Sequence, residues 1–192
     1  MLTHLDLAKL IDAGNWQTIG DNTQYKIVDT HDELVIAFCG STDRDDWWAN
    51  FDIQKRPYRY MSPVFLVHRG FANRWKACHD FFLALAGTTD KPITITGHSH
   101  GGALALLCLE DIRYNYPMIP LRCVTFGCPR VVGWWNFFKV RDRWFNTVQY
   151  RNGNDLVTHA PFVWMFYLHV TRQVKLNGKG HDIYKYIKGL MV

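Results

Sequence analysis

Hydrophobic and polar positions follow two different periods along the chain of 192 residues, and each period predicts its own kind of element. Where apolar residues recur every three or four positions, we expect a helix that packs one face on a core. Such helices are predicted over residues 3–13, 71–87, 103–109 and 134–145, and from about residue 182. Short runs of β-branched and aromatic residues predict strands instead. They cover residues 25–30, 34–40, 93–96, 121–126, 147–152 and 168–176.

The segment from residue 93 to residue 126 indicates how these elements connect. The strand ITIT, a glycine-rich turn, an apolar helix and the strand LRCVTF follow one another. This order is the βαβ unit of a parallel sheet with a right-handed crossover. Residues 31–33 predict a hairpin turn, and residues 41–63 predict an irregular segment. Because no repeat or linker divides the chain, we expect one compact α/β domain over residues 1–192, with a mostly parallel central sheet flanked by helices.

Composition and the N-terminal residues suggest a cytoplasmic protein. The chain is 48% hydrophobic and 20% charged, and no apolar run approaches the roughly 18 residues of a membrane span. Asp6, Lys9 and Asp12 interrupt the apolar core that a secretion signal needs. The five cysteines lack metal-binding spacing and lie mostly in apolar runs, which predicts buried reduced thiols. We expect cytoplasmic localisation, with release by lysis or a non-standard route left open.

Charge and aromatic content bear on the partner of the protein. The net charge is +5, but the basic residues are spread along the chain and form no nucleic-acid-binding motif. Eight Trp and twelve Phe exceed what a core of this size usually holds. Some of these rings should face a lipid or ligand, unless all of them pack in the core. We expect transient contact with a membrane or lipid-droplet surface and no nucleic-acid partner.

The strongest chemical signal is the G-x-S-x-G pattern formed by Gly97, Ser99 and Gly101. It lies between a β-branched strand and an apolar helix, where a serine is held on a strained turn and needs small neighbours. The helix that starts here directs free N–H groups and its positive dipole end at the space above the serine. We predict Ser99 as a nucleophile. The alternative is a glycine-rich connection in another βα unit.

A nucleophilic serine requires a histidine base and an acid that orients it. In α/β-hydrolases both follow the serine in the chain, at the ends of later strands. Asp155 is the downstream acid that directly follows a strand and the turn NGN, so we predict it as the acid, although a turn-capping aspartate is the alternative. For the base we favour His181, which follows the flexible segment KLNGKG, and keep His159 as second choice.

Two further residues near these candidates have structural interpretations. His169 lies within an aromatic and β-branched run, which is typical of a core histidine with satisfied hydrogen bonds. Asp182 is adjacent to His181, and we interpret it as a residue that starts the last helix.

From about residue 34 to the C-terminus the chain resembles the class 3 lipases, the family of the fungal triacylglycerol lipases. The similar motifs are FCGSTDRDDWWANF, VHRGF, GHSHGGALA, TFGCPRV, NGNDLVTHAP and HDIYKY, in the family's order. The sequence departs from the family at Cys39, where fungal relatives have arginine, and at His100, where leucine is usual. It is also shorter than secreted members and lacks their signal and disulfides, which argues against a secreted triglyceride lipase.

The resemblance implies an α/β-hydrolase fold and a catalytic triad of Ser99, Asp155 and His181. It also implies an oxyanion hole formed by the main-chain N–H groups of Ser41 and His100. A lid is implied over residues 42–65, with Trp47, Trp48 and Phe51 at helical spacing as lid and substrate-binding residues. The alternative for these aromatic residues is an immobile loop that packs on the core.

These observations predict a serine carboxylic-ester hydrolase of lipid esters, either a triacylglycerol lipase or an esterase. The reaction would pass through an acyl-enzyme and require no metal or cofactor. A phospholipase A1 or a monoacylglycerol esterase with the same triad is the alternative within this class. A catalytically idle lipid-binding protein is the alternative outside it.

Overall fold

The computed structural model describes residues 1–40, 52–58, 64–135 and 137–191, and within these ranges seven strands form the main sheet in the order β1-β2-β3-β6-β7-β9-β11. The strands from β3 to β11 run parallel to one another, whereas β2 is antiparallel to both β1 and β3. Their bounds are Gln17–Ile19 (β1), Thr23–Asp29 (β2), Leu34–Phe38 (β3), Ile93–His98 (β6), Leu121–Phe126 (β7), Thr147–Asn152 (β9) and Gln173–Leu176 (β11). The expected mostly parallel sheet is confirmed.

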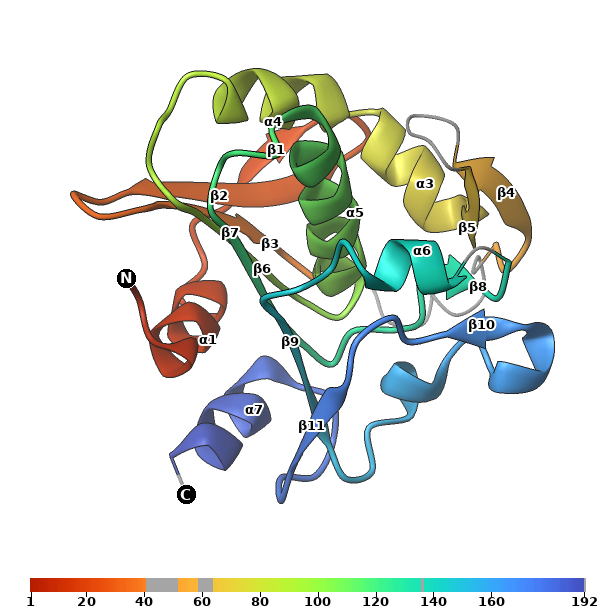
Figure 1. Ribbon diagram of the computed structural model, residues 1–192. Coiled ribbons are helices and arrows are strands. Elements are labelled where there is room, and N and C mark those ends of the chain that lie inside the picture. The colour runs from red at the N-terminus through yellow and green to blue at the C-terminus, as the bar shows by residue number, and fades with distance from the viewer. Residues whose placement is uncertain (41–51, 59–63, 136, 192) are drawn as a thin grey trace.

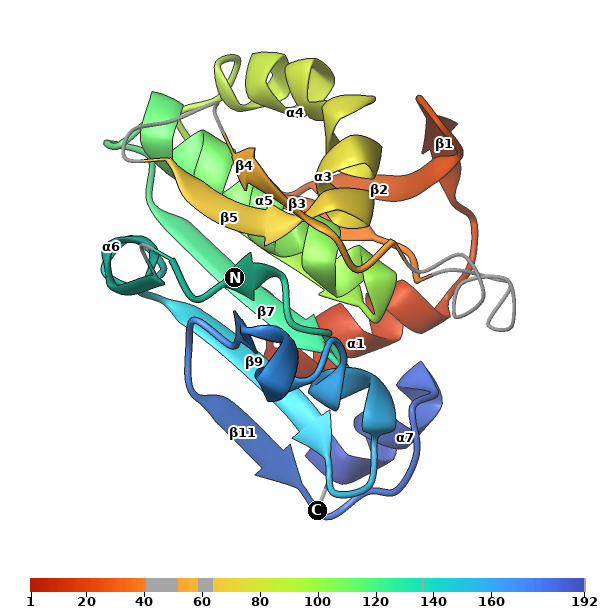
Figure 2. The ribbon, with the colours of Figure 1, turned by 90° about the vertical axis from the view of Figure 1, so that its right-hand side faces the viewer.

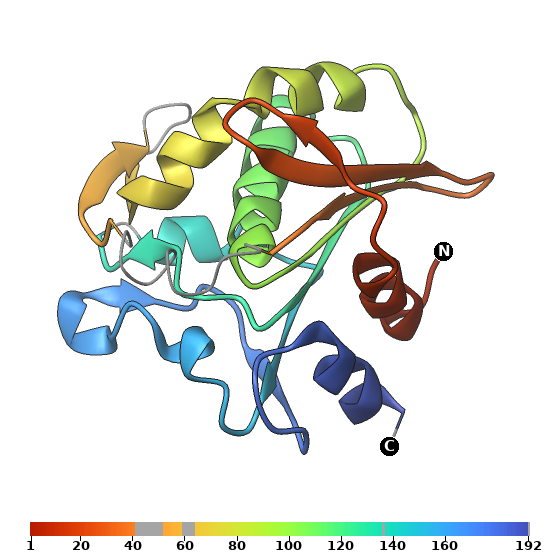
Figure 3. The same ribbon diagram turned by 180° about the vertical axis from the view of Figure 1, so that it is seen from behind.

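Helices cover both faces of this sheet (Figure 1). On one face lie α3 (Arg69–Lys76), α4 (His79–Ala86) and the long α5 (His100–Asn115). On the other face α1 (His4–Asp12) and α7 (Ile183–Leu190) pack against each other, near the two chain ends (Figure 3). Each face therefore has its own apolar core, and the inner strand β3 is buried along its whole length.

A small antiparallel sheet, which the sequence did not predict, lies beside the main one in the order β10-β8-β5-β4 (Figure 2). Its strands are β4 (Lys55–Tyr58), β5 (Phe65–His68), β8 (Val132–Gly133) and β10 (Tyr167–Leu168). The prediction of an irregular segment is therefore wrong for residues 55–58. The single strand predicted over residues 168–176 is also wrong, because β10 pairs in this sheet and β11 pairs with β9 in the main one. An apolar run does not show where a chain changes sheets.

The helix predicted over residues 71–87 is broken into α3 and α4 at Cys78. Cys78 has a φ of −138°, and its N–H donates to the Trp75 carbonyl in a tight turn (3.0 Å). The break lets the rings of Trp75 and Phe82 stack with centroids 5.7 Å apart, and both contact Phe38. The helix predicted over residues 134–145 is likewise reduced to α6 (Phe137–Arg141), because the chain before it continues from β8.

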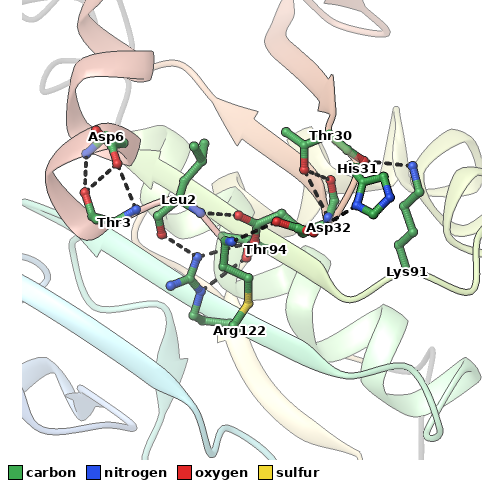
Figure 4. Close-up of polar contacts among 11 residues, drawn as sticks. Leu2, Thr3, Asp6, Thr30, His31, Asp32, Lys91, Thr94 and Arg122 are labelled. Atoms are coloured by element: carbon green, nitrogen blue, oxygen red, sulfur yellow. Dashed lines mark hydrogen bonds and ion pairs between the residues drawn. The ribbon is translucent and has the colours of Figure 1, made fainter.

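The N-terminal helix is confirmed and belongs to the folded core. Thr3 and Asp6 form a capping box, and Leu7 and Ile11 are buried on the sheet. Figure 4 shows how the chain before this helix is held: Arg122 donates to the Leu2 carbonyl (2.9 Å). The Leu2 N–H in turn donates to the buried carboxylate of Glu33, between β2 and β3.

The five cysteines are free, as the sequence predicts, and four of them are buried: Cys78, Cys108, Cys123 and Cys128. Burial raises the pKa of the Cys78 thiol to about 11, so it remains protonated. Among the helices of the described residues, none is both long and apolar enough to traverse a bilayer.

Candidate active site

Ser99 lies on the sharp turn between β6 and α5, at the carboxyl end of the parallel strands. Its φ of 56° and ψ of −125° are a strained conformation for a residue with a side chain. The turn is held by hydrogen bonds on both sides: Ser99 N–H donates to the Phe126 carbonyl (2.9 Å), and the Ser99 carbonyl accepts from the Gly102 N–H (2.9 Å). The main chain thus fixes the position of the serine.

The glycines around Ser99 are required because the backbones approach closely. A Cβ on Gly97 would lie 2.3 Å from the Gly101 carbonyl oxygen, and a Cβ on Gly101 would lie 2.3 Å from the Phe38 carbonyl oxygen. Both contacts are with backbone, which cannot move aside. The clearance expected from the G-x-S-x-G pattern is therefore present.

The structure brings Ser99, His181 and Asp155 into one hydrogen-bonded chain. His181 Nε2 lies 2.7 Å from Ser99 Oγ, and His181 Nδ1 lies 2.8 Å from Asp155 Oδ2. Asp155 follows β9 and begins the 310 helix η1 (Leu156–His159), where its Oδ1 accepts the Val157 N–H (3.0 Å). His181 comes from the loop between β11 and α7. Residues 82 and 26 positions apart thus meet at one edge of the sheet.

The electrostatics of Asp155 fix the proton positions in this chain. Burial acts to raise the pKa of the Asp155 carboxyl, but hydrogen bonding from His181 and its charge, together with Tyr186 and Val157, lower it overall. An ionised carboxylate only accepts hydrogen bonds, so His181 carries its proton on Nδ1. The Nε2 lone pair then faces the Ser99 hydroxyl, which donates to it.

Three residues to which the sequence assigned no role support the site. The Tyr186 hydroxyl, on α7, donates to Asp155 Oδ2 and accepts the Asn152 N–H (3.1 Å). Asn152 Nδ2 donates to the Gly180 carbonyl (2.9 Å), which anchors the residue before His181. Gly127 has a φ of +61°, and a Cβ there would lie 3.0 Å from Asp155 Oδ2 and from the His181 ring. Tyr186 and Gly127 lie in HDIYKY and TFGCPRV, so the motifs pointed to them without indicating their contacts.

His98 and His100 flank the serine and contact different parts of the site. The His98 ring lies over the His181 ring, with centroids 4.6 Å apart, and its Nε2 donates to the His181 carbonyl. His100 is the first residue of α5, and its main-chain N–H has no acceptor within the described part of the chain. Burial lowers the pKa of the His100 ring to about 4, so the ring is neutral beside Phe71. His100 therefore offers a free N–H at the positive end of a helix of 16 residues.

The other candidates lie apart from Ser99. His159, the second choice as base, contacts Arg151 through Nε2 (3.3 Å). His169 is held by Gln149 Oε1 (3.0 Å) and the Thr158 carbonyl (2.7 Å), as expected of a core histidine, and burial lowers its pKa to about 4. Asp182 is the residue before α7 and pairs with Lys185 (3.0 Å).

Four predicted site residues lie outside the described residues: Ser41, Trp47, Trp48 and Phe51. Gly40, at the end of the described segment, approaches the serine closely, since a Cβ on it would lie 3.3 Å from the Ser99 Cβ. Of the predicted lid segment 42–65, residues 52–58 and 64–65 are described; Lys55–Tyr58 form β4, and residue 65 begins β5. Across the described ranges, no group of three His, Cys, Asp or Glu side chains is arranged to hold a metal ion.

Comparison with known proteins identifies relatives over most of the chain. The family model "Lipase (class 3)" matches residues 35–165. Secreted mono- and diacylglycerol lipase A of Penicillium cyclopium is 29% identical over 165 residues, which are 80% of this chain and 52% of the relative. Toxin TseL of Vibrio cholerae is 37% identical over 109 residues, which are 52% of this chain and 15% of the toxin. The chain spans about half the length of the fungal relatives it matches.

These relatives overturn the expected cytoplasmic localisation. Several of them, from Penicillium, Fusarium and Malassezia, are named as secreted lipases. The expectation came largely from the first residues of the chain. These residues form α1 and pack on the core, so their polar and apolar pattern reflects the packing of a helix and gives no information on localisation. Buried thiols are equally uninformative, since a buried cysteine behaves as a small apolar side chain in any compartment.

The fold has the same relatives as the sequence. The native Rhizomucor miehei lipase propeptide complex superimposes with a TM-score of 0.75 at 24% identity, covering 85% of this chain and 56% of that one. At this identity the likeness shows the fold, which is the α/β-hydrolase fold expected from the motifs. The match of the family model over residues 35–165 shows the relationship itself: the chain belongs to the class 3 lipase family.

Proposed function

We propose that the protein is a serine carboxylic-ester hydrolase, with Ser99 as nucleophile, His181 as general base and Asp155 as the acid that orients the base. One observation carries the proposal: Ser99 Oγ, on a strained turn, donates to His181 Nε2 at 2.7 Å, while His181 Nδ1 donates to Asp155 at 2.8 Å. A nucleophile, a base and an orienting acid within hydrogen-bond distance are what acyl transfer requires.

In the proposed first step, Ser99 Oγ attacks the carbonyl carbon of the ester as His181 Nε2 accepts its proton. Asp155 stabilises the imidazolium that forms, because it remains ionised and faces Nδ1. The protonated Nε2 then gives its proton to the departing alcohol, which leaves an acyl group on Ser99. Water, deprotonated by the same Nε2, attacks the acyl-enzyme in the second step and releases the acid.

The oxyanion of each step would be stabilised at the start of α5. The free N–H of His100 and the helix dipole both favour negative charge there. We propose the N–H of Ser41 as the second donor, since Gly40 before it lies against Ser99. Removal of one such donor typically reduces kcat by about 10²-fold to 10³-fold.

For the substrate we propose a lipid ester, with mono- and diacylglycerols as the first compounds to test. The support is the family and the names of the fungal relatives, which are mono- and diacylglycerol lipases. A triacylglycerol lipase and a phospholipase A1 would use the same three side chains and differ in contacts to the rest of the substrate. Trp47, Trp48 and Phe51 remain our proposed lid residues.

The test is hydrolysis of chromogenic esters of increasing chain length, and of mono-, di- and triacylglycerols and phospholipids, by the parent chain and by Ser99→Ala. A fluorophosphonate probe labels activated serines and should label only the parent. Full activity in Ser99→Ala would contradict the assignment of the nucleophile. A folded parent that neither hydrolyses any of these esters nor reacts with the probe would instead support the idle lipid-binding alternative.

A further inference from the structure

Exposed aromatic side chains gather where two chain segments meet beside the small sheet. The Trp134 N–H donates to the Phe166 carbonyl (3.0 Å), and their rings contact each other with centroids 6.4 Å apart. Phe162 and Trp164 stack at 4.3 Å on the turn η2 (Val163–Met165). We call the following six exposed residues the aromatic surface: Trp134, Trp135, Phe162, Val163, Trp164 and Phe166.

The exposure of this surface is unusual for side chains of this size. Trp164 is 73% exposed, Phe166 61% and Trp134 57%. Single exposed apolar residues are common, but a contiguous aromatic group marks a surface that meets an apolar partner. The main chain also holds Phe166 outward at a φ of 59°, in the left-handed region that is unfavourable for a bulky residue. Phe166 ends η2 in this conformation, and its N–H donates to the Val163 carbonyl (2.8 Å), so the main chain at this residue is fixed.

The aromatic surface is connected to the candidate active site by a short and firmly held segment. Asp155 is the cap before η1, and only the three residues 160–162 separate the end of η1 from the start of η2. Arg130 holds this connection: its N–H donates to the Ala160 carbonyl (2.7 Å) and its Nη1 to the Pro161 carbonyl (2.9 Å). Lys55 Nζ donates to the Met165 carbonyl (2.6 Å). The surface therefore keeps a fixed position relative to the site.

Cationic side chains contact residues 159–165, the segment that leads to and carries part of the aromatic surface. Lys55 and Arg130 bond to main-chain carbonyls of the connecting segment, and Arg151 contacts His159. Among the described residues, no carboxylate forms an ion pair with any of these three cations. Tryptophan rings flanked by long cationic side chains suit the boundary between lipid tails and anionic headgroups.

We propose that the aromatic surface docks the protein on an anionic lipid surface and thereby holds the mouth of the site at a fixed depth above the lipid. The proposal rests on the proposed function, because a lipid ester must reach Ser99 from such a surface. β8 pairs with β10, and the Trp134 N–H bonds to the Phe166 carbonyl, so the two segments that carry the aromatic surface lie side by side (Figure 1).

The experiment measures binding and turnover separately. Binding is measured by co-sedimentation of Ser99→Ala protein, which leaves the lipid intact, with vesicles of phosphatidylcholine alone or mixed equally with phosphatidylglycerol. Trp164→Ser and Trp134→Ser are compared with a control, Phe145→Ser. Phe145 is as exposed as Trp134 (57% each), but it lies before the amino end of β9, whereas Asp155 and η1 follow the carboxyl end. Turnover is measured with Ser99 intact on a monomeric short ester and on the same acyl group presented in vesicles.

We expect each tryptophan variant to bind mixed vesicles on the order of tenfold more weakly, since an aromatic side chain loses its apolar burial. The ratio of vesicle to monomeric turnover should fall in parallel, Phe145→Ser should match the parent, and added salt or removal of phosphatidylglycerol should weaken binding. Equal binding by all variants would overturn the proposal. If the parent protein bound no vesicles but formed a dimer that Trp164→Ser dissociated, the aromatic surface would bind a second copy of the chain instead. Vesicle binding without any turnover would contradict the proposed function alone.

Discussion

A buried carboxylate lies near each end of helix α5 in similar surroundings, yet we propose a part in chemistry for only one of them. At the first end, Asp155 accepts from the Tyr186 hydroxyl and from His181, next to Ser99. At the last end, Asp111 accepts from the Tyr58 hydroxyl (2.7 Å) and from Trp75 Nε1 (2.6 Å). Each carboxylate thus has a tyrosine and a ring N–H as donors.

The two carboxylates differ in the direction in which their pKa is shifted. Burial raises the pKa of Asp111 to about 6, and the neutral donors Tyr58 and Trp75 offset this only in part. The pKa of Asp155 is lowered, because His181 can take up a proton and become a cation. We therefore propose that Asp155 stabilises the charge that forms on its titratable partner His181, whereas Asp111, whose donors are fixed, is a structural anchor.

The largest expected effect is that of Asp155→Asn. The amide can donate to His181 Nδ1, which would place the ring proton on Nε2 and leave no lone pair for Ser99. We expect kcat for a soluble ester to fall by about 10⁴-fold, as in a serine triad with the same change. The matched Asp111→Asn should stay within about threefold of the parent, because tertiary contacts far from the site rarely alter the chemical step. Similar losses in both variants would remove the distinction between the two ends.

The next effect concerns Gly127, which gives the Asp155–His181 pair its space. In Gly127→Ala the new methyl group would lie 3.0 Å from Asp155 Oδ2 and from the His181 ring, at a φ of +61° that alanine disfavours. A misplacement of about 1 Å can cost 10²-fold in rate, so we expect about that loss in kcat. The loss in unfolding free energy should be about 1–2 kcal/mol. Parent-like kcat at a reduced unfolding free energy would show that the pair tolerates displacement.

Asp111 should give a pH dependence of stability that Asp155 does not share. Because its pKa is raised in the folded state, its contribution is fully present below the unfolded value of 3.8 and is lost as pH rises through about 6. The loss is about 3 kcal/mol at 1.36 kcal/mol per pKa unit. Urea unfolding of the parent and of Asp111→Asn between pH 4 and pH 7 should therefore diverge by about that amount. Parallel curves would mean that Asp111 titrates normally.

Much of the site was predictable because chain order and local chemistry converge on it. Ser99 is identified by its flanking glycines and elements, and Asp155 by its place directly after a strand. Both lie at strand ends, where parallel topology brings distant residues together. His181 needed one further criterion, a loop before the last helix, and this left His159 open until three-dimensional distances separated them.

The supporting residues and the small sheet were not predictable in the same way. Tyr186 and Asn152 act through single contacts between α7, β9 and the loop before His181, and such contacts have no period in the sequence. The short strands β4, β8 and β10 have two to four residues each, too few to establish an alternating pattern. Helix breaks such as that at Cys78 arise from packing of Trp75 and Phe82, which overrides a continuous apolar stripe.

The smallest expected effect is that of removing a tyrosine hydroxyl, Tyr186 beside Asp155 or Tyr58 beside Asp111. Tyr186→Phe removes a hydrogen bond to Asp155 Oδ2 and leaves the Asn152 N–H without an acceptor, so Asp155 should be less acidic and hold His181 less well. We expect kcat to fall by about threefold to tenfold, from a bond worth about 0.5–1.5 kcal/mol. The acid limb of the pH profile of kcat should also move, because the charge that stabilises the imidazolium is weakened.

Tyr58→Phe removes the equivalent bond to Asp111 and should lower only the unfolding free energy, by about 1 kcal/mol. If both variants lowered only the unfolding free energy, Tyr186 would support the fold and not the reaction, as Tyr58 does.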